Sequence, residues 1–186
     1  MIYINDDIAA LNLQVMLEQL SEQRREQALR YKHELGQKLN AAAYLLLCEA
    51  LRSEYGIEEK PLFEYGEWGK PFIAGHPDIH FNLSHCRTAA ICAVSQRPIG
   101  VDIETFHTAK DSLIRYTMND MERARIASSP HPDMEFTRLW TQKEAKVKLA
   151  GEGIRKDMKE VLSGGEKFLT VVNFQRGYVY SVLETV

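Results

Sequence analysis

Apolar positions recur along the chain with two spacings, and these spacings separate the predicted helices from the predicted strands. The clearest helical stretch is residues 37–55, where leucines and alanines recur at intervals of three and four and Gly56 follows as a stop signal. Three further stretches have helix-forming composition without internal Gly or Pro, at residues 21–32, 111–129 and 133–149. The second of these is expected to break near Asn119, whose spacing to Glu122 predicts a capping box.

Strands are predicted where apolar residues alternate with polar ones or form short continuous runs. Residues 78–83 alternate in this way, the period of a strand with one buried face. The apolar run 89–94, a turn region at Gln96-Arg97-Pro98 and a second apolar run ending at Glu104 predict a β-hairpin. Further strands are expected at residues 1–4, 167–174 and 178–183. A long helix followed by a hairpin thus occurs in each half of the chain, which indicates an α+β fold.

Two carboxylates, Asp102 and Glu104, stand at the end of the predicted strand that finishes the hairpin. Side chains alternate between the faces of a strand, so these two lie on the same face. Like charges side by side repel each other, and a hard divalent cation that binds carboxylate and phosphate oxygens would compensate. The alternative is a pair of solvated charges that closes a strand.

A third acid lies on the predicted helix 133–149. Trp140, Glu144 and Lys148 are spaced four residues apart and therefore share one face of that helix. A large anchor, an acid and a base therefore point the same way, as a site would require. The alternative is a buried tryptophan beside an ordinary surface pair of Glu and Lys.

Ser84 and His85 follow the predicted strand 78–83. Adjacent residues of an extended chain point to opposite faces, so the two are poorly placed as a nucleophile and its base. Hydrogen bonds from the Ser hydroxyl and a His ring nitrogen to a diphosphate are the favoured interpretation.

The composition of the chain indicates which classes of protein are not expected. The chain has 186 residues, of which 45% are hydrophobic, and a net charge of -3, which gives no general basic field for nucleic acid. Its three cysteines lack metal-type spacing and indicate reduced thiols, so a cytoplasmic protein is expected. Residues 1–7 contain acids, and no apolar run reaches 18 residues, so neither a signal peptide nor a membrane span is expected.

Taken together, four motifs resemble those of the 4′-phosphopantetheinyl transferases of the surfactin-synthetase-activating type. In chain order they are Gly-Lys-Pro-Phe at 69–72, Asn-Leu-Ser-His at 82–85, Gly-Val-Asp-Ile-Glu at 100–104 and Trp-x-x-Lys-Glu-Ala-x-x-Lys at 140–148. A Gly-Glu-Gly turn at 151–153 follows the last motif. Each motif alone is weak, whereas four in the same order at similar separations are specific. The resemblance covers residues 60–155.

The resemblance implies two similar α/β halves, residues 1–104 and 105–186, related by a pseudo-twofold axis. Each half would pack a long helix on a small antiparallel sheet, with a cofactor cleft between the halves. The implied activity is that of a holo-[acyl-carrier-protein] synthase. Such an enzyme transfers the 4′-phosphopantetheine arm of coenzyme A to a serine of a carrier protein and releases 3′,5′-ADP, with Mg²⁺ or Mn²⁺ as cofactor.

The resemblance also implies roles for individual residues. Asp102, Glu104 and Glu144 would hold the metal ion, and Lys148 would neutralise charge on the departing 3′,5′-ADP. Either Glu144 or a metal-bound water would take the proton of the carrier serine, so Asp102, Glu144 and Lys148 form the predicted catalytic group. The predicted coenzyme A ligands are Arg24, Lys38, Lys70, Pro71, Ser84, His85 and Lys148.

The expected partner is an apo acyl carrier protein, or a peptidyl or polyketide carrier domain, docking on residues 110–130. The pathway, whether fatty acid, polyketide or peptide synthesis, stays open. A monomer is expected because two halves in one chain complete the cleft. Neither nucleic acid nor a membrane is an expected partner. Two alternatives remain, a metal-dependent phosphohydrolase or nuclease using the same acids, and a non-catalytic module that binds coenzyme A or a carrier protein.

Overall fold

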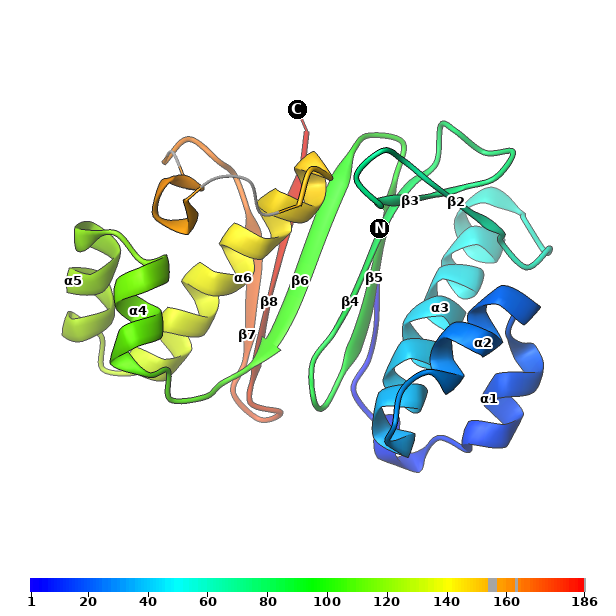
Figure 1. Ribbon diagram of the computed structural model, residues 1–186, viewed down its shortest axis with the longest axis horizontal. Helices are drawn as coiled ribbons and strands as arrows, with labels where there is room; N and C mark the ends of the chain where they lie inside the picture. The colour runs from blue at the N-terminus through cyan, green and yellow to red at the C-terminus, as the bar shows by residue number, and fades with distance from the viewer. Residues whose placement is uncertain (154–156, 163, 186) are drawn as a thin grey trace.

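The computed structural model describes residues 1–153, 157–162 and 164–185, and its strands occupy the middle of the molecule with helices on both sides (Figure 1). The helices are α1 (Leu13–Gln19), α2 (Glu22–Leu29), α3 (Glu34–Tyr55), α4 (Asp111–Thr117), α5 (Asp120–Ser128) and α6 (Pro132–Ala150), with 3-10 turns η1 (Ile8–Ala10) and η2 (Met158–Glu160). The strands are β1 (Ile2–Asn5), β2 (Phe63–Tyr65), β3 (Pro71–Ile73), β4 (His80–His85), β5 (Ala90–Ser95), β6 (Ile99–Thr105), β7 (Leu169–Asn173) and β8 (Tyr178–Glu184). No helix among the described residues is long and apolar enough to cross a membrane.

The first sheet has the strand order β1-β5-β4, with antiparallel pairing throughout. Its central strand β5 is buried over nearly its whole length because both of its faces are covered. Cys92 and Val94 pack with residues of α3, whereas Ile91 and Ala93 pack with residues of the second sheet. Helix α3 therefore covers the outer face of this sheet, and the second sheet lies against its inner face.

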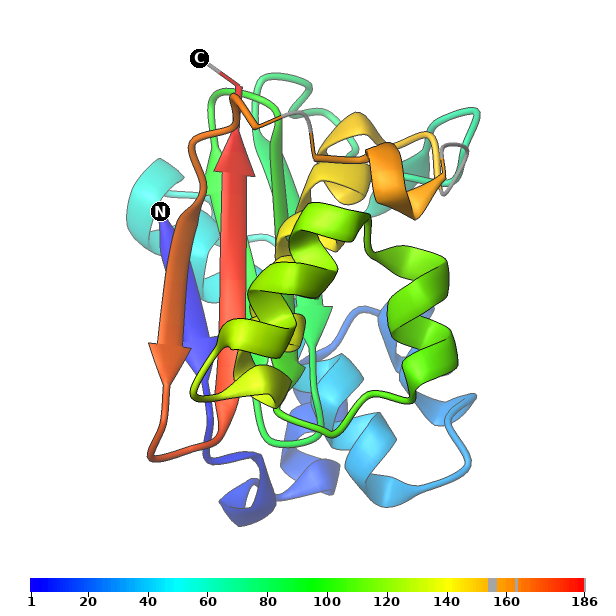
Figure 2. The same cartoon turned by 90° about the vertical axis from the view of Figure 1, so that its left-hand side faces the viewer.

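The second sheet has the order β6-β8-β7, also antiparallel, and α6 packs on it. The close approach of α6 to β6 depends on Gly100, where a Cβ atom would lie 2.1 Å from the carbonyl oxygen of Ala145. A third apolar cluster, which includes Met118, Ile126 and Phe136, joins α4 and α5 to α6. Figure 2, viewed from that side, shows these three helices in front of the strands.

The two sheets share one topology. The order strand, long helix and two antiparallel strands occurs as β1, α3, β4, β5 and again as β6, α6, β7, β8, and the hairpin's second strand is central in both sheets. The hairpin β2–β3 and helices α1, α2, α4 and α5 are additions to this plan. The predicted α+β class is confirmed. The pseudo-twofold axis and the division after residue 104 stay predictions. Strand β6, most of which precedes this division, pairs within the second sheet.

The predicted hairpin across residues 89–104 is wrong. Strand β5 pairs with β1 and β4, whereas β6 pairs with β8, for example Val101 opposite Val182. The amide of Val101 instead donates a hydrogen bond of 3.0 Å to the side-chain oxygen of Asn82 on β4. The alternation of apolar and polar residues along a strand shows which of its faces is buried. It does not show which strand pairs with it, because the pairing strand can lie far away in the chain. The predicted break near Asn119 is confirmed, including the capping box with Glu122.

Candidate active site

A cavity of about 720 Å³ opens where β4 of the first sheet approaches β6 of the second. Its wall is built from α2, α3, the β2–β3 hairpin, β4, β6 and α6. Trp140, Glu144 and Lys148 all line it, as their shared helix face predicted. The cavity therefore brings together side chains from both halves of the chain.

Asp102 is the centre of a polar cluster at one end of this cavity. The carboxylate is only 4% exposed, and its Oδ1 accepts hydrogen bonds from Lys148 Nζ at 2.6 Å and Ser84 Oγ at 2.9 Å. Lys148 also donates to Ser84 Oγ at 2.9 Å. The other oxygen, Oδ2, is buried and has no hydrogen-bond partner among the described residues. Ser84 and Lys148 thus satisfy Oδ1 of this carboxylate, and Oδ2 is available to a ligand.

Glu104 and Glu144 lie beside this cluster in an environment that disfavours negative charge. Burial, and then the charge of Asp102, raises the pKa of Glu104 to about 7. The same two causes, in the same order, raise the pKa of Glu144. Two carboxyl groups whose ionisation is disfavoured in this way favour the uptake of a cation or a proton.

These acids suit a divalent cation in their chemistry. Within residues 1–153, 157–162 and 164–185, no three Asp, Glu, His or Cys side chains are grouped closely enough to hold a metal ion as they stand. However, the unpartnered Oδ2 of Asp102 and the raised pKa values of Glu104 and Glu144 fit a hard cation with oxygen ligands. Asp102, Glu104 and Glu144 are therefore the acids of this cavity whose chemistry fits such a cation.

Arg24 supplies a buried positive charge at another part of the cavity wall. The residue is 6% exposed, and burial lowers its pKa. Its guanidinium donates to Gln27 Oε1 at 2.5 Å and Asn40 Oδ1 at 3.1 Å, and it lies over the rings of Tyr44 and Phe63. No carboxylate pairs with it within the described part of the chain, and its Nε has no hydrogen-bond partner there. A buried cation without an acid favours an anionic ligand.

Lys70 and His85 complete the basic lining. Lys70 Nζ donates to the carbonyl oxygen of Leu149, at the end of α6, at 2.8 Å, and burial lowers the pKa of Lys70. This bond attaches the β2–β3 hairpin to α6. Burial, and then the charge of Lys148, lowers the pKa of His85, so the ring is held neutral near pH 7.

All but one of the predicted site residues line this cavity. Arg24, Lys70, Pro71, Ser84, His85, Asp102, Glu104, Glu144 and Lys148 do so. Lys38 does not, and its ammonium pairs with Glu34 at 2.9 Å. Ser84 forms hydrogen bonds with both Asp102 and Lys148, so it orients these two groups.

Several lining residues escaped the sequence analysis. Asn40, Tyr65 and Trp68 lie on the cavity wall. Asn40 falls on the apolar-patterned stretch 37–55 as a polar exception, which is the one signal that points to it. The two aromatic residues have no local signal, because a surface aromatic is common in folded proteins.

Comparisons with known proteins agree with the geometry. A family model described as the 4′-phosphopantetheinyl transferase superfamily matches residues 98–180, which include β6 and α6. The chain is similar to a 4′-phosphopantetheinyl transferase of Bacillus subtilis, with 30% identity over 157 residues, 82% of this chain and 70% of the relative.

Two further relatives carry the same activity in their names. The 4′-phosphopantetheinyl transferase Sfp of Bacillus subtilis (strain 168) is 28% identical over 73% of this chain and 62% of its own length. The transferase gsp of Aneurinibacillus migulanus is 34% identical over 59% of this chain and 48% of its own length. The chain thus spans between about half and two thirds of the length of these two relatives.

Proposed function

The chain belongs to the 4′-phosphopantetheinyl transferase superfamily, and on this premise we propose that it transfers the 4′-phosphopantetheine arm of coenzyme A to a serine of a carrier protein. One observation carries the proposal. A single cavity is lined by an acidic cluster with a lysine, Asp102, Glu104, Glu144 and Lys148, and by the buried, acid-free cation Arg24. A substrate with a diphosphate and a separate phosphate group matches this distribution of charge.

Coenzyme A is held by its phosphates in this proposal. Arg24 receives the 3′-phosphate, since a doubly charged phosphate satisfies a guanidinium that has only neutral partners. His85 and Lys70 face the nucleotide and the diphosphate. Lys70 can exchange its bond to the Leu149 carbonyl for a bond to phosphate.

The reaction is a displacement at the phosphorus next to the pantetheine. The serine oxygen of the carrier forms a bond to this phosphorus, and the bond to the bridging oxygen breaks. The electron pair leaves with 3′,5′-ADP. Glu144 accepts the serine proton, a role that suits a carboxyl group whose pKa is raised by burial. Lys148, one helical turn from Glu144 and also on the cavity wall, neutralises charge on the departing 3′,5′-ADP.

Asp102, Glu104 and Glu144 would hold Mg²⁺ in this proposal, and Mn²⁺ has the same ligand preferences. When bound, the ion supplies Lewis-acid polarisation and charge neutralisation at the diphosphate. Asp102 offers Oδ2, the oxygen that Lys148 and Ser84 leave free. Ser84 and Lys148 keep Oδ1 fixed and so hold the carboxylate plane in one orientation.

Helices α4 and α5 are the proposed docking surface for the carrier, an acidic helical protein. Leu113, Tyr116 and Met121 leave 36%, 75% and 84% of their surface exposed here. Lys110 precedes this apolar group in the sequence, and Arg115 lies within it. Exposed apolar residues with basic neighbours suit an acidic amphipathic helix.

Intact mass spectrometry of an apo acyl carrier protein tests the proposal directly. After incubation with this protein, coenzyme A and Mg²⁺, the carrier should gain the mass of one phosphopantetheine arm, and EDTA should abolish the gain. Absence of any gain with acyl, peptidyl and polyketide carriers, despite tight binding of coenzyme A in calorimetry, would indicate a binding module. Release of phosphate or nucleotide without carrier modification would indicate a hydrolase.

Glu144→Gln tests whether Glu144 belongs to the site. The variant should retain the fold while transfer falls at least about a hundredfold, because a metal ligand and the base are lost together. Urea unfolding checks the fold, and initial rates of carrier modification measure transfer. Transfer near the original rate would remove Glu144 from the site.

A further inference from the structure

Lys143, the residue beside Glu144, is a charged side chain that the reaction does not use. It is fully buried, at 0% exposure, and does not line the cavity. Its Nζ lies 2.8 Å from Glu122 Oε1 and donates to the carbonyl oxygen of Met158 at 2.5 Å. A buried ammonium is tolerated only with such partners, so the positions of Glu122 and Met158 relative to α6 are strongly constrained.

Glu122 extends this constraint to the start of α5. Its Oε2 accepts the backbone amide of Asn119 at 2.8 Å, which closes the capping box of the helix. The side-chain amide of Asn119 in turn donates to the carbonyl oxygen of Lys159 at 3.3 Å. One ion pair therefore joins α6 to the junction between α4 and α5 and to η2.

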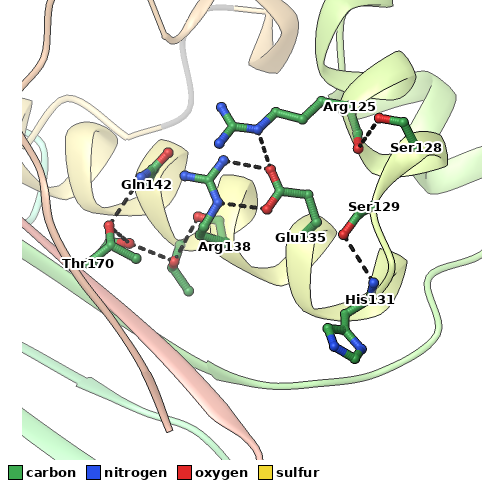
Figure 3. Close-up of polar contacts among 10 residues, drawn as sticks. Arg125, Ser128, Ser129, His131, Glu135, Arg138, Gln142 and Thr170 are labelled. Carbon is green, nitrogen blue, oxygen red and sulfur yellow. Dashed lines mark hydrogen bonds and ion pairs between the residues drawn. The ribbon is translucent and has the colours of Figure 1, made fainter. Parts of the chain in front are cut away.

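A second carboxylate connects the other end of α5 to α6. Glu135 on α6 is 7% exposed, and it binds Arg125 of α5 and Arg138 of its own helix (Figure 3). Arg125 is mostly exposed, with 62% of its side-chain surface accessible, so solvent screens this contact. The buried pair of Lys143 and Glu122 is the less screened of the two links.

A buried ion pair contributes little net stability compared with an apolar pair, but it tolerates less variation in geometry. The apolar cluster between these helices would accept small sliding movements, whereas the pair of Lys143 and Glu122 accepts one arrangement. Because Lys143 and Glu144 are consecutive, movement of α5 relative to Lys143 is also movement relative to Glu144.

We propose that Lys143 is a positioning residue, which through Glu122 holds the carrier-docking helices α4 and α5 at a fixed place relative to Glu144. The inference rests on the proposed function, in which the carrier docks on α4 and α5 and its serine reaches Glu144. Coenzyme A contacts neither Lys143 nor Glu122, since neither lines the cavity. The pair therefore affects the use of the carrier and not the binding of coenzyme A.

The double variant E122Q/K143M tests this role without leaving a buried charge unpaired. The glutamine side chain introduced by E122Q can still accept the amide of Asn119, because capping boxes use Gln as well as Glu. The matched control is K146M/E166Q, which neutralises another Lys–Glu pair of α6 that leads to the loop before β7 instead of to α5. Thermal unfolding checks that both variants are folded.

Steady-state kinetics with carrier and coenzyme A varied separately, and hydrogen exchange over residues 111–128, are the measurements. In E122Q/K143M, kcat/KM for the carrier should fall at least about tenfold, since a displacement near 1 Å is costly to catalysis. Exchange over 111–128 should become faster, and the calorimetric Kd for coenzyme A should stay within about twofold, because the cavity is unchanged. The control should match the unmodified protein in all three measurements.

A folded E122Q/K143M with unchanged carrier kinetics and unchanged exchange would overturn the proposal. Equal losses for carrier and coenzyme A would also overturn it, because they indicate general destabilisation. If the double variant does not fold, E122Q alone, which keeps a hydrogen-bond acceptor for Lys143, is measured against the same criteria. Hydrogen exchange needs no transfer activity. A protein that modifies no carrier would thus refute the proposed function, while faster exchange over 111–128 would still support the positioning role.

Discussion

Gly100 is the residue at which the smallest chemical change should disturb the site most. Its backbone φ is not in the left-handed region, so alanine meets no backbone strain there. Instead, the added Cβ would lie 2.1 Å from the carbonyl oxygen of Ala145, and 2.6 Å and 3.0 Å from the amide nitrogen and Cα of Leu149. All three are backbone atoms of α6, so no side chain can rotate to make room.

The size of the effect follows from these distances. Nonbonded carbon contacts are comfortable at about 3.5 Å, so α6 must move away from β6 by roughly 1 Å or more. The bond of 2.6 Å between Lys148 Nζ and Asp102 Oδ1 joins the same two elements and would be stretched or broken. Overpacking of this kind costs about 1–3 kcal/mol of stability, and a displacement near 1 Å costs about a hundredfold in rate.

Urea unfolding and initial rates of carrier modification measure both consequences in Gly100→Ala. The matched control is Gly165→Ala, where an added Cβ meets nothing within 4 Å and φ is not left-handed. The control should unfold within about 0.5 kcal/mol of the unmodified protein and keep its transfer rate. A Gly100→Ala protein with full stability and full transfer would refute the idea that the approach of α6 to β6 sets the geometry of the site.

Three further predictions concern the charged lining. The raised pKa of Glu104, about 7, means that the folded protein favours its neutral form, so stability present below pH 4.5 is lost as the pH rises through 7. Glu104→Gln should therefore unfold at higher urea concentration than the unmodified protein at pH 8 without added metal, but not at pH 4.5; equal pH dependence would contradict the assignment. Lys70→Met should weaken coenzyme A binding in calorimetry by about tenfold or more. Unchanged affinity would mean that the Lys70 ammonium binds only the Leu149 carbonyl oxygen and not coenzyme A. Arg24→Met should weaken coenzyme A about tenfold or more but 3′-dephospho-coenzyme A much less, and equal losses would place the 3′-phosphate elsewhere.

Local patterns were reliable wherever one segment decides the outcome. The period of residues 78–83 predicts β4, and the spacing of apolar residues over 37–55 predicts α3 with its stop at Gly56. The four-residue spacing of Trp140, Glu144 and Lys148 places all three on the cavity wall, because a helix surface is determined by the positions along that helix alone.

Contacts between distant segments could not be predicted in the same way. The sequence predicted that residues 89–104 form a hairpin, but β6 pairs with β8, a strand more than seventy positions later. The composition of residues 21–32 predicted a helix but not its surroundings, and Arg24 on this helix is buried over aromatic rings from α3 and β2. Lys143 belongs to the motif at 140–148, but its burial against Glu122 follows only from the packing of α5 on α6.

The sequence by itself determined the elements, their buried faces and the residue types of an acid and lysine site, because these follow from spacing along one segment. The tertiary structure decided which strands pair, which charges lose their water and which of the candidate ligands meet in one cavity. Periodicity is a local property of the chain, whereas pairing and burial depend on which distant surfaces fill the same space.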